Sequence, residues 1–133
     1  MQASDSSFEI RQIFRHKKRF LDLLLLADEQ ESMIDLYLER GEMFALYDQN
    51  ILKTICVVTD EGGKTIELKN IATDPQYQKQ GYGKRLIRFI SEHYAGKYDT
   101  LLVGTGESPL TIPFYEQNDS NTRIVSRFLY RQL

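Results

Sequence analysis

The sequence predicts one mixed α/β domain of the α+β type, with a mostly antiparallel central sheet flanked by helices. Strand-like apolar runs follow one another between residues 42 and 73. A helical apolar pattern occupies residues 81–95, and a short apolar run follows it at residues 99–106. Hairpins followed by a strand–helix–strand order predict antiparallel pairing that ends in a parallel crossover.

Composition is consistent with one domain over residues 1–133. The chain is 41% hydrophobic and 27% charged, as in ordinary globular proteins, and its formal net charge of -2 does not favour nucleic-acid partners. Its one cysteine, Cys56, fits a reducing compartment. No apolar run approaches the roughly 20 residues of a membrane span, and the N-terminus lacks a secretion signal. These features predict a cytoplasmic protein without a membrane partner.

The N-terminal half begins with a short strand at "FEIRQI", residues 8–13. Apolar residues at helical spacing predict a helix over residues 16–27. Asp28, followed by Glu31, resembles a capping box that begins a second helix, and Gly41 is its stop signal. The buried positions expected on this second helix are Met33, Ile34, Tyr37 and Leu38.

Further elements follow in order. Residues 42–48 and 51–60 read as strands joined by a tight Gln49-Asn50 turn, and a Gly-Gly turn leads to a third strand at 64–74. Gly96 ends the helix over residues 81–95. Its apolar positions are Leu86, Phe89, Ile90, His93 and Tyr94. Residues 108–118 read as a short helix capped by Ser108.

The stretch "DPQYQKQGYGKRLIRFI", residues 74–90, places Gly81 and Gly83 where a loop enters a helix. A helix N-terminus presents unpaired N–H groups and partial positive charge, and glycines let a phosphate approach them. The spacing fails a Walker A loop, which needs glycine where Gln78 stands. It fits a dinucleotide fingerprint poorly, because Leu86 replaces the third glycine or alanine.

A third pattern, Gln/Arg-x-x-Gly-x-Gly/Ala, is matched by Gln78, Gly81 and Gly83. Here the sequence resembles the GNAT superfamily of acyl-CoA-dependent N-acyltransferases. Residues 67–87 resemble the family's fourth strand, pyrophosphate loop and third helix, and residues 101–118 resemble its fifth strand and the following helix. The resemblance implies a GNAT-like fold and an N-acetyltransferase activity with acetyl-CoA as co-substrate and no metal.

The resemblance also implies where the coenzyme binds. Main-chain groups of Ile71 and Ala72 would pair with the pantetheine arm. Backbone amides of the loop would hold the diphosphate, and the residues concerned are Gln78, Lys79, Gln80, Gly81, Tyr82, Gly83 and Lys84. Lys84, Arg85 or Arg88 could reach the 3′-phosphate, although each also reads as part of a solvated helix face.

For the chemistry, the resemblance implies direct attack of an amine on the thioester. Tyr115, within Phe-Tyr-Glu, would be the general acid for the thiolate, or else a packed aromatic residue. Glu67 and Glu107 are candidates for the base or for positioning a water, and Glu107 also for binding the acceptor. Asp28 and Glu29 would attract a cationic amine if they are not simply helix caps.

Other polar residues are assigned no chemistry. Cys56 lies in an apolar strand and reads as a buried thiol. His16 and His93 are far apart in the sequence, so no metal site is expected.

The C-terminal part departs from the family pattern. Asp119-Ser120 replaces the usual Gly-aromatic pair, and residues 121–133 are too few for the usual final hairpin. This tail reads either as a strand or as an amphipathic helix. A shortened sheet would expose an edge that homodimerisation could cover. It also leaves open an alternative function as a non-catalytic acyl-CoA-binding or protein-interaction module.

Overall fold

A six-stranded mixed sheet organises the computed structural model, which describes residues 7–103 and the backbone of residues 123–126. The strands are β1 Phe8–Ile13, β2 Glu42–Asp48, β3 Ile51–Gly62, β4 Thr65–Thr73, β5 Thr100–Val103 and β6 Arg123–Ser126. They lie in sequence order across the sheet. β1 to β4 pair antiparallel, whereas β4–β5 and β5–β6 pair parallel. The predicted fold class is confirmed.

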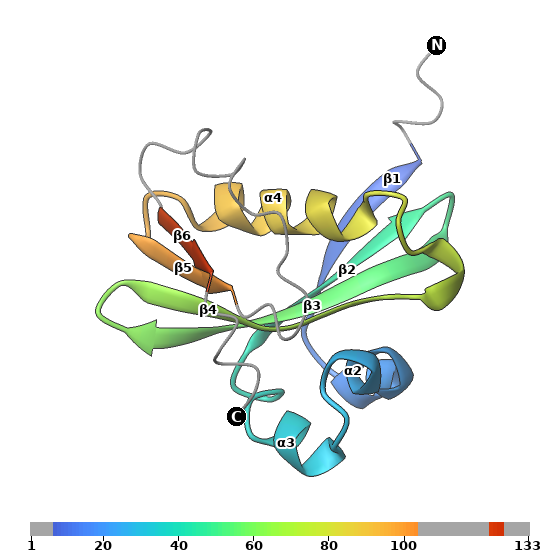
Figure 1. Cartoon of the computed structure of the whole chain (residues 1–133), viewed down its shortest axis with the longest axis horizontal. Helices are drawn as coiled ribbons and strands as arrows, with labels where there is room; N and C mark the ends of the chain where they lie inside the picture. The colour runs from blue at the N-terminus through green and yellow to red at the C-terminus, as the bar shows by residue number, and fades with distance from the viewer. Residues whose placement is uncertain (1–6, 104–122, 127–133) are drawn as a thin grey trace.

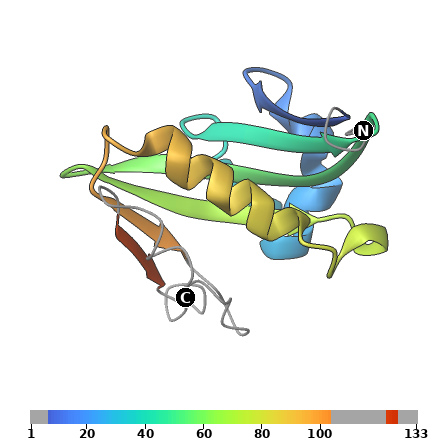
Figure 2. The ribbon, with the colours of Figure 1, turned by 90° about the horizontal axis from the view of Figure 1, so that it is seen from above.

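Helices cover both faces of the sheet (Figure 1). α4, Tyr82–Tyr94, crosses one face, and the view in Figure 2 shows it lying over the central strands. The 3-10 turn η1 (Lys17–Phe20) and the helices α2 (Leu21–Ala27) and α3 (Glu31–Asp35) lie on the other face. A second 3-10 turn, η2 (Pro75–Tyr77), follows β4. The sheet therefore separates a face covered by α4 from a face covered by α2 and α3.

Each face has its own apolar core. The α4 side buries Phe44, Leu46, Cys56, Val58, Ile66, Leu68, Leu86, Ile87, Ile90, Tyr94, Leu101 and Val103. The α2 side buries Ile13, Phe20, Leu23, Leu24, Ile34, Tyr37, Leu38, Met43, Ala45, Ile55, Val57 and Ala72. Both cores take alternate residues of the same strands, because successive side chains of a strand point to opposite faces.

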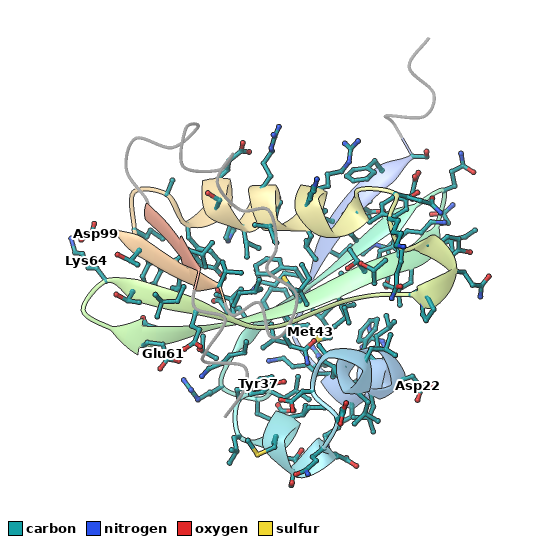
Figure 3. All side chains as sticks on the ribbon, viewed as in Figure 1. Asp22, Tyr37, Met43, Glu61, Lys64 and Asp99 are labelled. Carbon is teal, nitrogen blue, oxygen red and sulfur yellow. The ribbon has the colours of Figure 1, made fainter. Side chains whose placement is uncertain are left out.

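The predicted hairpin turns are confirmed by backbone conformation. Gln49 and Asn50 both have positive φ, 56° and 66°, as a two-residue turn that matches the twist of its strands requires. Gly62, Gly63 and Lys64 also have positive φ at the β3–β4 turn. The Lys64 carbonyl accepts a hydrogen bond from the Asp99 N–H at 2.8 Å, and Figure 3 shows these two residues side by side.

The prediction of a capping box at Asp28 is wrong. Asp28 has extended backbone at the end of α2, and α3 begins later, after Gln30, without a side-chain cap. The Asp28 carboxylate instead accepts a hydrogen bond from the Tyr37 hydroxyl at 3.0 Å. Met33 is 43% exposed rather than buried, whereas the other three positions predicted for this stripe are buried.

α4 is close to the predicted helix, but its buried face is rotated. Gly81 and Gly96 flank it with φ of 91° and 90°, so the predicted glycine boundaries are confirmed. Ile87 and Ser91 are buried, whereas His93 is exposed and stacks on Phe89. The His93 ring also meets that of buried Phe44, so His93 lies at the exposed border of the predicted apolar stripe.

Part of the C-terminal segment is described. Arg123–Ser126 form a strand parallel to β5, so the strand interpretation of the tail is confirmed for these residues. The helix predicted over residues 108–118, with Glu107 and Tyr115, lies outside the described residues. Among the described residues, none of the helices has both the length and the apolar character needed to cross a membrane.

Candidate functional site

The β4–α4 junction forms an exposed loop that leads into a helix N-terminus. Residues 78–81 are exposed, and Gly81 precedes α4 with φ of 91°, a conformation that glycine adopts without steric cost. A Cβ added at Gly81 would meet nothing within 4 Å, and one added at Gly83 only the Thr73 hydroxyl at 3.7 Å. A Cβ at Gly81 would therefore stand in open space, and one at Gly83 would fit with an ordinary contact.

Local hydrogen bonds shape this loop. The Asp74 carboxylate caps η2 by accepting from the Gln76 N–H at 2.9 Å, and the Gln78 amide donates to the Thr73 carbonyl at 3.2 Å. The first turn of α4 contains no acidic residue. The exposed helix N-terminus can therefore attract an anion through its N–H groups and partial positive charge.

β4 extends toward this loop. Within the described residues, β4 and β5 pair from Thr65–Thr100 to Leu68–Val103, and β4 continues to Thr73. The Ala72 carbonyl accepts from the Thr54 hydroxyl at 2.8 Å, which directs the main-chain groups of Ala72 toward β3. Because neighbouring residues of a strand alternate in direction, the N–H and C=O of Ile71 face the β5 side. That edge can pair with an extended ligand.

A bulge in β4 brings polar side chains to the face covered by α2 and α3. Val57 pairs with Asn70 and Val58 with Leu68, so Lys69 is the extra residue. Glu67 is only 5% exposed, and its Oε1 lies 3.3 Å from the Lys69 Nζ. A nearly buried carboxylate is therefore held beside an ammonium group at the bulge.

Asn70 connects this bulge with the α2–α3 join. Its side-chain amide donates to the Leu24 carbonyl and to the Tyr37 hydroxyl, both at 3.0 Å. Tyr37 in turn donates to Asp28 at 3.0 Å, and Figure 3 shows Tyr37 on the α2–α3 side of the sheet. The Asn70 Oδ1 is buried and has no hydrogen-bond partner within residues 7–103. A polar network thus joins Asp28 to the strand that carries Glu67.

Glu61 adds a second carboxylate to the charged side chains at the β4 bulge. Its Oε2 lies 4.0 Å from the Lys69 Nζ and 3.3 Å from Arg40, so Lys69 lies between Glu61 and Glu67. Burial raises the pKa of Glu61, but the Thr59 hydroxyl and the neighbouring cations outweigh it, and the pKa lies below its ordinary value. The carboxylates of Glu61 and Glu67 therefore both have cationic side chains beside them.

Glu29 is exposed beside Asp28 on the α2–α3 join, and Lys84 is exposed in the first turn of α4, directly after the glycine loop. Cys56 is fully buried, and burial raises the pKa of its thiol, so it is no ready nucleophile. Residues 7–103 contain no cluster of His, Cys, Asp and Glu suited to a metal ion.

Sequence reasoning missed the partners of Glu67 and Asp28. A sequence signal existed for Lys69, because residues two apart in a strand share a face. None existed for the Asn70–Tyr37–Asp28 network, since the bulge places Asn70 on the same face as Lys69 instead of the opposite one.

Sequence comparisons match this chain to acetyltransferases. A family model described as an acetyltransferase (GNAT) domain matches residues 39–119, which include β2 to β5 and α4. An uncharacterised N-acetyltransferase of Bacillus subtilis, YvbK, is 40% identical over 91 residues, or 67% of this chain. The matched segment spans 58% of the length of that relative.

Solved structures extend the similarity to the fold. A GNAT acetyltransferase of Elizabethkingia anophelis with acetyl-CoA bound has 31% identity and a TM-score of 0.72, covering 84% of this chain and 74% of its own. A Bacillus subtilis acetyltransferase in complex with CoA has 33% identity and a TM-score of 0.71, with the same coverage of 84% and 74%. The resemblance carried by Gln78, Gly81 and Gly83 is thereby confirmed, and the chain belongs to the acetyltransferase (GNAT) domain family.

Proposed function

We propose that the protein transfers an acetyl group from acetyl-CoA to a primary amine of a small molecule or peptide. The observation that carries this proposal is the β4–α4 junction, where an exposed glycine loop and a helix N-terminus follow the end of β4. Two structural relatives with 31% and 33% identity contain acetyl-CoA and CoA. A family fold with a complete diphosphate loop favours an enzyme over a binding module.

The coenzyme would follow the edge of β4. The backbone amides of residues 78–83, with Lys84, would hold its diphosphate at the start of α4. The pantetheine arm would pair with the main chain of Ile71, and Ala72 would line its path. This places the thioester near the β4 bulge, where the N–H of Ile71 can stabilise the oxyanion.

The proposed reaction is direct transfer. The amine nitrogen forms a bond to the thioester carbon, and the carbon–sulfur bond then breaks to release CoA. Glu67 accepts the proton that the amine loses, directly or through a water, on the oxygen not paired with Lys69. Tyr115 donates a proton to the departing thiolate. The products are an N-acetylated amine and CoA with a free thiol.

The amine would enter from the face covered by α2 and α3. Asp28 and Glu29 lie at the α2–α3 join, and the polar network from Asp28 reaches Asn70 on the same strand as Glu67. These two carboxylates, together with Glu107, would attract a cationic acceptor. The free, buried Cys56 fits action in the reducing cytoplasm.

A homodimer through the C-terminal segment belongs to the same proposal. β6 is the last strand in the order of the described sheet, and its outer edge has no partner strand there. A second copy of the chain could pair with that edge.

Release of CoA thiol, followed with a chromogenic disulfide across a panel of amines, tests this function. We expect Tyr115→Phe and Glu67→Gln each to lower kcat by about 100-fold or more, the typical contribution of a general acid or base, while acetyl-CoA binding by calorimetry is kept. Tyr98→Phe is the matched control, because Tyr98 binds Asp60 beside the β3–β4 turn. Absence of turnover with every amine, despite coenzyme binding, would favour the binding module.

A further inference from the structure

Lys53 is aimed toward the glycine loop by a second bulge. Leu46 pairs with Thr54 and Tyr47 with Leu52, so Lys53 is the extra residue of β3. Leu52 packs with the core beneath α2. A bulge redirects a side chain relative to regular alternation, and the Lys53 side chain emerges on the α4 side of the sheet.

The Lys53 side chain lies against the two tyrosines on either side of the loop of residues 78–81. Its Nζ lies 3.3 Å from the ring centroid of Tyr77 and 5.5 Å from that of Tyr82. Tyr77 ends η2 and Tyr82 begins α4, so these rings flank residues 78–81 on both sides. The Lys53 carbonyl also accepts from the Asp74 N–H at 2.9 Å. Main chain and side chain of Lys53 therefore both support the loop.

The described residues supply no counter-charge for Lys53. It is 7% exposed, yet no ion pair or hydrogen bond joins its Nζ to any residue in the described ranges. Asp48 is engaged elsewhere, because its Oδ2 accepts from the Tyr82 hydroxyl at 2.8 Å and this bond raises the pKa of Tyr82. Lysines this buried normally pair with an anion, since an unpaired charge loses its hydration.

We propose that Lys53 belongs to the diphosphate site and is the fixed counter-charge beneath it. Its ammonium attracts the diphosphate from below while the loop amides bind it from above, and Tyr77 and Tyr82 hold the ammonium in place. The identity of the ligand as a coenzyme rests on the proposed function. The motif itself does not include Lys53, which lies 25 positions before Gln78.

Local charge agrees with this assignment. Lys79, Lys84 and Arg85 carry positive charge on and beside the loop, and the Asp74 carboxylate is occupied in capping η2. A purely structural role for Lys53 would use only its contact with the tyrosine rings, which a long apolar side chain could replace. The two roles therefore differ in their dependence on charge.

The test is calorimetric titration with acetyl-CoA and, separately, with inorganic diphosphate at two ionic strengths. The variants are Lys53→Met, which keeps the packing, Lys53→Gln as a second neutral variant, and Lys53→Arg, which keeps the charge. Lys97→Met is the control, because Lys97 is exposed beyond the opposite end of α4. Thermal unfolding without ligand identifies the variants that fold.

We expect both neutral variants to bind acetyl-CoA and diphosphate about tenfold more weakly, as loss of one partly screened charge pair predicts. Their binding should also depend less on salt. Lys53→Arg and Lys97→Met should stay within about threefold of the native chain.

Equal affinities in the native chain and a folded neutral variant would overturn the assignment of Lys53 while leaving the proposed function intact. Weak binding by Lys53→Arg equal to that of the neutral variants would also overturn it, since charge would then not be what matters. Lys53-dependent binding of diphosphate without binding of acetyl-CoA would support the anion site and overturn the proposed function. Binding of neither probe by the native chain would overturn both.

Discussion

Enlarging Gly83 separates the binding role of the glycine loop from its folding role. An added Cβ would meet only the Thr73 hydroxyl at 3.7 Å, an ordinary contact, and Gly83 has helical rather than left-handed backbone. In a helix interior, glycine is about 1 kcal/mol less favourable than alanine and valine about 0.6. Gly83→Ala should thus raise the free energy of unfolding by up to about 1 kcal/mol, and Gly83→Val by up to about 0.5.

Gly83→Val should bind acetyl-CoA more weakly although its stability rises. The methyl groups of valine would stand where a diphosphate oxygen approaches the first N–H groups of α4. Loss of one hydrogen bond to a charged group costs about 1.5–3 kcal/mol, equivalent to about 10- to 150-fold in Kd. Gly83→Ala is the matched control, because the family pattern accepts either residue there, and we expect its affinity to stay within about threefold of the native value.

Urea unfolding and calorimetric titration with acetyl-CoA measure the two effects on the same preparations. A folded Gly83→Val variant that binds acetyl-CoA as tightly as the native chain would refute the placement of the diphosphate at this helix N-terminus. Loss of stability in Gly83→Ala would refute the inference that a Cβ fits at this position without strain.

Two further predictions concern stability. Gly41→Ala should lower the free energy of unfolding in urea by about 1–3 kcal/mol, because its Cβ would lie 2.7 Å from Val57 and 2.9 Å from the Tyr37 carbonyl; an unchanged midpoint would contradict this reasoning. The second prediction concerns pH. Hydrogen bonds from a backbone N–H and a tyrosine hydroxyl lower the pKa of Asp60 below its ordinary value of 3.8. The pKa of Glu61 lies below its ordinary value of 4.5, because its hydrogen bonds and neighbouring cations outweigh burial, which raises it. Because both carboxylates have lower pKa values when folded, their stabilising contribution is complete above those ordinary values and is lost as pH falls through the folded-state values. The contribution of Asp60 and Glu61 to the urea midpoint should therefore change little between pH 7 and 5, and the midpoint should fall at pH 3. A midpoint that rises at pH 3 would contradict the expected direction of this dependence.

The glycine loop could be predicted from the sequence because its signals are contiguous. Glycine conformations and the apolar period of α4 depend on residues a few positions apart. The hairpin at Gln49-Asn50 was predictable for the same reason. Errors arose where tertiary contacts decided the outcome, as when Asp28 bonded to Tyr37 instead of capping a helix.

The polar environment of the site required the tertiary structure. Bulges at Lys53 and Lys69 change the face to which neighbouring side chains point, and a bulge depends on how two strands pair. Asn70 reaches Leu24, 46 positions away, only once α2 packs on β4. No pattern within a single segment encodes such contacts.

Residue order alone is enough to predict the succession of elements, the strand–helix crossover and the glycine loop from Gln78 to Gly83, because periodicity and turn chemistry are local properties of the chain. The charges around that loop and around the β4 bulge follow instead from the way the elements pack. Packing brings Lys53 beneath Tyr77 and places Lys69 between two carboxylates, because these contacts depend on strand register and on which face of the sheet each helix covers.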